Sequence, residues 1–134
     1  MKKIAFVLCT LLFLVACSGD DGVSMNDVVG KWECSSSLIT YTDVKTGEII
    51  HEEDTKDTWN FTLYENGTGR DIGDDKIWPY EVNGNQLIIN GSIKWNLQLV
   101  SHDIMKLSRE EEYFDYDKER QVRLSRLLTY MRKE

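Results

Sequence analysis

Apolar and polar residues alternate along the chain from Asn26 onward, and turn-forming residues interrupt the alternation about every eight to twelve residues. Alternation with a period of two places one set of side chains on each face of a β-strand. The pattern therefore predicts an antiparallel meander of short strands. We expect these strands at Lys31–Thr42, Glu48–Glu53, Thr58–Tyr64, Ile77–Val82, Gln86–Ile89, Ser92–Val100 and Ile104–Phe114.

The turns between the strands carry signals of their own. Glu65–Gly69 is predicted to be a turn because it contains the dipeptide Asn66-Gly67, which adopts positive φ readily. The dipeptides Asn83-Gly84 and Asn90-Gly91 are typical of two-residue hairpin loops. Because loop length sets strand pairing, these two dipeptides are expected to fix the register of three consecutive strands.

The C-terminal segment Arg120–Lys133 fits two interpretations. A helix would place four apolar residues on one face, namely Leu124, Leu127, Leu128 and Met131. Strand alternation instead gives two runs separated by a bulge, Val122 with Leu124 and Leu128 with Tyr130. A meander without a final strand would leave the edge of Ile104–Phe114 unpaired, and native proteins avoid such edges. We therefore favour the strand.

About eight antiparallel strands in sequence can close into an up-and-down barrel, because closure removes both edges of the sheet. We therefore predict an all-β domain, a small antiparallel barrel formed by residues 26–134. Residues 17–25 are small and acidic, which is typical of a flexible tether. Residues 1–16 differ in composition from both and form a separate N-terminal helical segment.

The N-terminal segment begins with Lys2-Lys3 and continues with the apolar stretch Ile4–Val15, as secretory signals do. Leu14-Val15-Ala16-Cys17 resembles the lipobox of bacterial lipoproteins. This resemblance implies cleavage before Cys17, acylation of that cysteine with fatty acids such as palmitate, and anchorage to a membrane. Ser18 resembles the residue that follows the cysteine in outer-membrane lipoproteins. The acidic pair Asp20-Asp21 leaves both the periplasmic and the surface-exposed face open.

The formal charge of the chain is −7, and loss of Lys2 and Lys3 with the signal makes it −9. Nucleic-acid binding and electrostatic attachment to anionic lipids both need clustered cations, so the composition argues against both. Removal of Cys9 and acylation of Cys17 leave Cys34 as the remaining thiol, so no intramolecular disulfide is expected. We expect a monomer that packing alone stabilises.

Residues that carry chemistry are sparse. His51 and His102 stand beside turns or acidic residues, where solvated side chains are expected, and Cys34 fits a small core position. Metal-ligand spacings, phosphate-binding loops and serine-nucleophile motifs are missing from the sequence. The acidic segments Asp71–Asp75 and Glu110–Asp117 are expected to be solvated. We therefore predict no catalysis, no metal and no cofactor.

Four segments together resemble the lipocalin-like barrels of small bacterial lipoproteins. They are the Gly-x-Trp pattern at Gly30-Lys31-Trp32, the strand and Asn-Gly-Thr-Gly turn at Trp59–Gly69, and the segments Tyr80–Ile89 and Leu97–Leu107. The resemblance covers residues 26–107. It implies that Gly30 and Trp32 are structural and that Trp32 closes one end of the barrel. A basic side chain from the last strand, Arg126 or Arg132, would then cover this tryptophan.

The inward face of the predicted sheet carries large aromatic side chains. The candidate ligand-binding residues on this face are Trp59, Phe61, Trp78, Tyr80, Trp95 and Leu97. An eight-stranded barrel is either filled by its own side chains or holds one small ligand, and large rings in a short barrel favour filling. We predict a lipid-anchored, non-enzymatic envelope protein that binds a small apolar ligand. The alternative is an accessory protein–protein interaction module of the envelope with a filled core.

Overall fold

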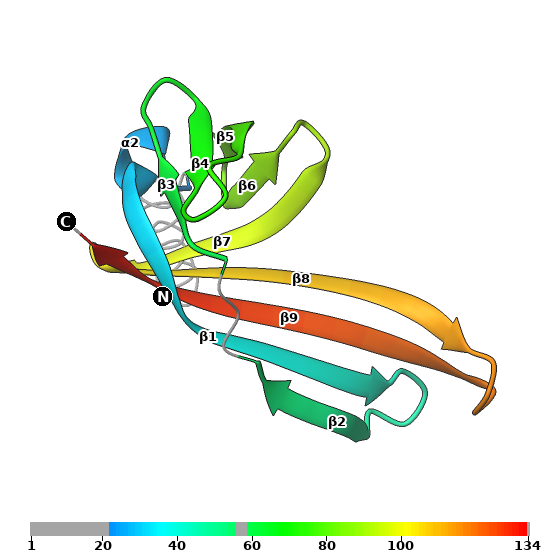
Figure 1. The fold of residues 1–134 in the computed structure, drawn as a ribbon. Helices are drawn as coiled ribbons and strands as arrows, with labels where there is room; N and C mark the ends of the chain where they lie inside the picture. The colour runs from blue at the N-terminus through cyan, green and yellow to red at the C-terminus, as the bar shows by residue number, and fades with distance from the viewer. Residues whose placement is uncertain (1–21, 56–58, 134) are drawn as a thin grey trace, which may run out of the picture.

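The computed structural model describes residues 22–55 and 59–133, and its architecture is a closed antiparallel barrel of eight strands with one extra strand (Figure 1). This confirms the predicted all-β fold, which is compatible with a lipocalin-like domain. Cys17 and the rest of the predicted signal lie outside the described residues. The strands are β1 Gly30–Asp43, β2 Ile49–Asp54, β3 Phe61–Leu63, β4 Thr68–Asp71, β5 Ile77–Asn83, β6 Gln86–Ile89, β7 Ile93–Ser101, β8 Ile104–Asp115 and β9 Arg120–Lys133.

The barrel closes through the first and last strands. From β3 to β9 each strand pairs with the next one along the chain, and β9 pairs with β1. The beginning of β1, from Gly30 to Trp32, pairs with β3 and completes the barrel. The later part of the same edge, from Leu38 to Thr42, pairs with β2 instead. The extra strand β2 therefore lies outside the barrel.

Strand length explains why part of the sheet leaves the barrel. β1, β8 and β9 contain 14, 12 and 14 residues, whereas β3 and β4 contain 3 and 4. The far ends of the three long strands continue past their short neighbours and, with β2, form a projecting sheet (Figure 1). We call this sheet the arm and define it as residues 37–54 and 109–126.

The C-terminal segment is a strand, as favoured from the sequence. β9 pairs with β8 from Ile104 to Asp115 without a register shift, so the expected bulge within β9 is wrong. The irregularity lies on β1 instead, between Cys34 and Ser36. Because β1 contains one extra residue here, its inward positions change from the even-numbered Cys34 to the odd-numbered Ser37. The inward residues of β1 therefore stay opposite the inward residues of β9 on both sides of the bulge.

The predicted turn Glu65–Gly69 is shorter than expected, because Thr68 and Gly69 already belong to β4. Gly69 lies opposite Trp78 of β5 in the ladder. A Cβ atom at Gly69 would come within 2.3 Å of the Trp78 ring. The missing side chain therefore makes room for the indole, and this is why β4 shows no apolar residue at this inward position.

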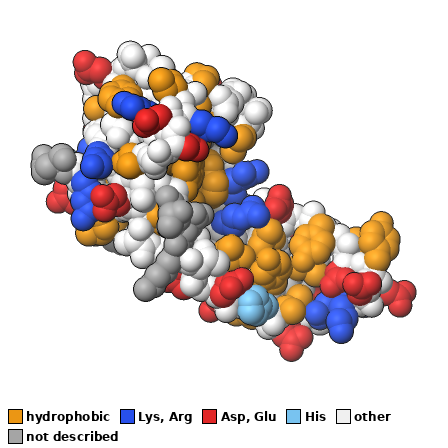
Figure 2. All heavy atoms as spheres, viewed as in Figure 1, with side chains coloured by type: hydrophobic (Ala, Val, Ile, Leu, Met, Phe, Trp, Pro, Cys, Tyr) orange, Lys and Arg blue, Asp and Glu red, His pale blue; other side chains and the backbone are white. Residues whose placement is uncertain are grey.

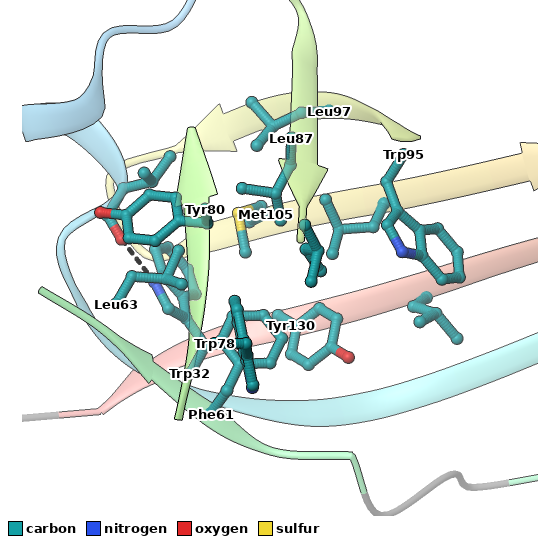
Figure 3. Close-up of a cluster of buried hydrophobic side chains, with 14 residues drawn as sticks. Trp32, Phe61, Leu63, Trp78, Tyr80, Leu87, Trp95, Leu97, Met105 and Tyr130 are labelled. Atoms are coloured by element: carbon teal, nitrogen blue, oxygen red, sulfur yellow. Dashed lines mark hydrogen bonds between the residues drawn. The ribbon is translucent and has the colours of Figure 1, made fainter. Parts of the chain in front are cut away.

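The barrel interior is filled by its own side chains (Figure 3). Phe61, Leu87, Met105 and Tyr130 are fully buried, and ring contacts link Phe61 to Tyr130 with centroids 4.8 Å apart. The members of this core are Val28, Trp32, Phe61, Leu63, Trp78, Tyr80, Leu87, Ile89, Trp95, Leu97, Met105, Leu107, Leu128 and Tyr130. The inward face predicted from the alternation is therefore the core of the barrel.

The short helix α2, Met25–Val28, lies at one end of the barrel (Figure 1), and the buried Trp32 side chain packs there with Val28. The Trp32 indole is fully buried, and its Nε1 donates a hydrogen bond of 2.9 Å to the carbonyl oxygen of Val28. The Arg132 guanidinium lies 4.3 Å from the centroid of the Trp32 ring. It also donates to three backbone carbonyls, those of Asp27, Val29 and His102. Arg132, rather than Arg126, therefore covers the tryptophan.

The chain that precedes α2 is also packed on the barrel. Val23 and Met25, which the sequence assigned to the tether, contact the core, and the Val23 amide donates to the carbonyl oxygen of Gly84. Over the described ranges 22–55 and 59–133, no helix has the length and apolar character needed to cross a bilayer.

Candidate functional site

The barrel end opposite α2 opens onto the arm, and we call this opening the mouth. It holds a concave pocket of about 260 Å³. The pocket is lined by Ser37, Ile39, Trp59, Trp95, Arg109, Arg126 and Leu128. Two larger concavities, of about 470 and 600 Å³, lie beside the N-terminal segment, and neither is lined by Trp, Tyr or Phe among the described residues. A third, of about 270 Å³, lies on the arm and is lined by Tyr41 and Tyr113, which are not among the predicted ligand residues. The mouth is therefore the concavity that the predicted aromatic residues form.

The floor of the pocket is a cluster of aromatic rings. The Trp59 ring centroid lies 6.1 Å from that of Trp95 and 4.8 Å from that of Phe61. Two indole N–H groups donate to the same carboxylate oxygen, Oδ1 of Asp71, from Trp59 at 3.0 Å and from Trp78 at 2.8 Å. Asp71 therefore fixes both rings, although the sequence predicted only a solvated turn residue there.

The wall of the pocket is cationic. The Arg109 guanidinium on β8 lies 5.2 Å from the centroid of the Trp95 ring, a cation–π distance. Arg126 on β9 lies directly opposite Arg109 in the β8–β9 ladder. Its guanidinium forms an ion pair with Glu111 at 3.2 Å. Within the described part of the chain, Arg109 has neither a hydrogen bond nor an ion pair through its side chain.

This pair of arginines is unusual for the molecule. Like charges directly opposite each other on a ladder destabilise the sheet, and the chain as a whole is acidic. Only Arg126 of this pair has a carboxylate partner among the described residues, the side chain of Glu111. The mouth therefore combines an aromatic floor with a wall that carries two guanidinium groups.

The six candidate ligand residues separate into two groups. Trp59 and Trp95 line the mouth pocket, and Trp95 belongs to the core as well, whereas Phe61, Trp78, Tyr80 and Leu97 are core residues that do not line this pocket. Figure 3 shows Trp95 set apart from the other labelled rings. Tyr80 donates its hydroxyl to the carbonyl oxygen of Tyr64 at 2.7 Å, and burial raises the Tyr80 pKa to about 12. Its hydroxyl is therefore a protonated structural group.

The sequence interpretation missed Arg109 and considered Arg126 only as a cover for Trp32. The sequence did indicate that these two arginines are part of a site, because both occupy inward positions of their strands. Arg109 follows Leu107 by two residues, and Arg126 lies between Leu124 and Leu128 at the same spacing. Charged residues at the inward positions of an alternating strand mark the end of a dry core or the wall of a polar site.

The remaining candidates for chemistry lie apart from the mouth. The side chains of His51 and His102 are 58% and 79% exposed. Cys34 packs against the core, and its Sγ lies 3.4 Å from the carbonyl oxygen of Ser36. Gly30 and Trp32 belong to the end of the barrel where α2 lies. In the ranges 22–55 and 59–133, no three His, Cys, Asp or Glu side chains are grouped so that they would hold a metal ion.

Comparison with known proteins adds no family to this picture. No protein-family model matches the chain, and no curated protein or solved structure was found to be similar to it. The function is therefore inferred from the geometry of the mouth and from the residues of the sequence.

Proposed function

We propose that the protein is a lipid-anchored protein of the bacterial cell envelope whose barrel binds a small apolar ligand at the mouth, without catalysing a reaction. The observation that carries the proposal is the pocket of about 260 Å³ in which Trp59 and Trp95 are brought together at the open barrel end. Small-molecule sites are typically concave, mostly apolar and supplied with a few polar groups.

Because side chains fill the interior of the barrel, we expect the ligand to bind at the mouth and not inside the barrel. Side chains such as Phe61 and Met105 are fully buried, so a ligand cannot enter the barrel deeply without displacing them. At the mouth, Ile39, Leu128 and the two tryptophan rings provide apolar surface without such displacement. The pocket volume lies near the lower limit of about 300–1,000 Å³ that is usual for ligand sites. The ligand is therefore small.

The lipid anchor is proposed on the sequence alone. The lipobox-like segment Leu14–Cys17 follows a basic and an apolar stretch, and the acidic domain offers no clustered cations for attachment to anionic lipids. Attachment through acyl chains on Cys17 would hold the barrel at the outer membrane, on its periplasmic or its exposed face.

A second function is favoured by the arm. Hydrophobic side chains gather along the visible face of the arm (Figure 2). Ile50 and Tyr113 are 36% and 43% exposed and, with Tyr41 and Val122, line a shallow concavity of about 270 Å³. Exposed apolar patches with polar rims are typical of protein interfaces. An accessory interaction module with a filled barrel is the corresponding alternative.

Ligand titration tests the proposal, because all four tryptophans of the chain belong to the described barrel. A neutral aromatic probe, phenylbutanamide, is expected to change the tryptophan emission of the purified protein saturably. Ile39→Phe fills the mouth and should weaken this binding. Leu38→Phe, the neighbouring position on the opposite face of β1, is the matched control and should leave it unchanged. Emission that fails to saturate, or equal binding by both variants, would contradict a binding site at the mouth.

A further inference from the structure

We infer that the mouth selects an anionic amphiphile: a monocarboxylate whose head pairs with Arg109 and Arg126 and whose compact apolar body lies on Trp59 and Trp95. This inference rests on the proposed function and specifies the chemical class of its ligand. Four observations support it.

The first observation is the environment of Arg109. Every other arginine of the chain has oxygen partners: Arg70 with Asp75, Arg120 with Asp43, Arg123 with Glu112, Arg126 with Glu111, and Arg132 with backbone carbonyls. The guanidinium of Arg109 lies over the ring of Trp95 and forms no hydrogen bond or ion pair with a described residue. Its hydrogen-bond donors therefore remain available to a ligand in the pocket that it lines.

The second observation is the cross-strand pair. Arg109 and Arg126 face each other across the β8–β9 ladder and line the same pocket, so their charges repel. A bound anion between them would remove this repulsion. Residue arrangements that destabilise the local structure are common at functional sites.

The third observation is the local charge. Arg126 is paired with Glu111, so Arg109 is the guanidinium of the pocket wall that has no carboxylate partner among the described residues. A monoanion would pair with this guanidinium, whereas a dianion would bring a second negative charge close to Glu111. Guanidinium groups pair with planar carboxylates through two parallel hydrogen bonds. A carboxylate therefore fits both the charge and the donor geometry.

The fourth observation is the shape of the pocket. The aromatic floor lies directly beside the cationic wall, because the Arg109 guanidinium lies over the Trp95 ring. The ring centroid of Trp59 is 6.1 Å from that of Trp95. A ligand whose charged head and apolar body are adjacent satisfies both surfaces at once. A bare inorganic anion would not use the apolar surface of the floor, and a purely apolar molecule would not use the hydrogen-bond donors of Arg109.

Two ligands of equal shape test the selectivity. Phenylbutanoate carries a carboxylate where phenylbutanamide carries a neutral amide, and both are titrated into the purified full chain. We expect the carboxylate to bind about tenfold more tightly or better, as charge-assisted hydrogen bonds are stronger than neutral ones. Arg109→Gln and Arg126→Gln should each weaken carboxylate binding about tenfold and change amide binding by less than about twofold.

Arg123→Gln is the matched control. Arg123 lies on the opposite face of β9 and is paired with Glu112 at 3.1 Å, much as Arg126 is paired with Glu111. This variant should bind both ligands as the unmodified protein does, and circular dichroism establishes the fold of each variant. Equal affinity for carboxylate and amide would overturn the anion selectivity but leave the apolar site intact. Failure of both ligands to saturate would overturn the proposed function as well.

Discussion

At the residue scale, an arginine side chain lies over a tryptophan ring at each end of the barrel. The two pairs differ in the other contacts that the arginine makes. Arg132 lies 4.3 Å from the Trp32 ring centroid and also donates to backbone carbonyls at the end where α2 lies. Arg109 lies 5.2 Å from the Trp95 ring centroid at the mouth and has no such acceptors among the described residues. The first pair is therefore structural, and the second remains open to a ligand.

Trp32→Ala tests the structural role of the barrel end where α2 lies. Trp32 is fully buried and hydrogen-bonded to Val28, so its truncation should cost about 3–5 kcal/mol of the free energy of unfolding. This is a large part of the roughly 5–15 kcal/mol that stabilises a small domain. Urea unfolding followed by circular dichroism measures the loss. Ile77→Ala, at a position that is 70% exposed, is the control and should change the free energy by about 0.5 kcal/mol or less. A loss below about 1 kcal/mol in Trp32→Ala would contradict the closing role.

At the element scale, alternation was enough to predict most strands, because a half-buried strand shows its inward residues directly. It failed for β4, where Gly69 faces the Trp78 ring and carries no apolar signal of its own. It also failed for the bulge beside Cys34, because an extra residue in β1 changes pairing without changing composition. The prediction from the sequence therefore placed the bulge on β9, although β9 pairs with β8 without any irregularity.

The candidate site was predictable only in part. Trp59 and Trp95 were expected on the inward face, because aromatic residues in register with core positions point inward. Arg109 and Arg126 were not expected at the site, because only the structure shows that their strands extend beyond β7 and β3 into the arm. The unequal length of neighbouring strands thus creates the mouth, and a single sequence does not reveal which strands become neighbours.

The turn between β1 and β2 is expected to make the stability of the arm depend on pH. Asp43 accepts hydrogen bonds from the backbone amides of Thr46 at 3.0 Å and Lys45 at 2.9 Å, and Arg120 lies 3.7 Å from its second oxygen. The Thr46 amide is the main cause that lowers the Asp43 pKa below its ordinary value of 3.8; burial opposes this effect, and Lys45 and Arg120 lower the pKa further.

Because folding lowers the pKa of Asp43, the ionised carboxylate stabilises the folded protein. This stabilisation is fully present above pH 3.8, the ordinary pKa, and is lost as the pH falls through the folded pKa. Asp43→Asn should therefore lower the urea midpoint at neutral pH, and the difference from the unmodified protein should shrink in acid. Asp117→Asn, in the exposed turn between β8 and β9, is the control and should leave the urea midpoint at neutral pH unchanged. A difference for Asp43→Asn that stays constant as the solution is acidified would contradict the assignment.

At the scale of the whole molecule, the mouth lies at the end of the barrel that is opposite the start of the described chain. The described chain begins at the end where α2 lies, and Val23 is hydrogen-bonded there to Gly84 in the turn between β5 and β6. Turns at alternate hairpins of an antiparallel meander share one end, so this turn lies on the side of α2 and the mouth lies on the other. With the proposed anchor at Cys17, the mouth and the arm would open away from the point of attachment.

Metabolic labelling with a palmitate analogue tests the anchor itself. If Cys17 is acylated, cells that express the unmodified chain should yield a labelled protein in the membrane fraction, because several acyl chains on one residue bind a bilayer stably. Cys17→Ser should lose both the label and the membrane association. Cys34→Ser is the control, because Cys34 packs against the barrel core and should not be acylated. Label that persists in Cys17→Ser would exclude Cys17 as the acylated residue, whereas loss of label in Cys34→Ser with Cys17 intact would place the acyl chain on the barrel.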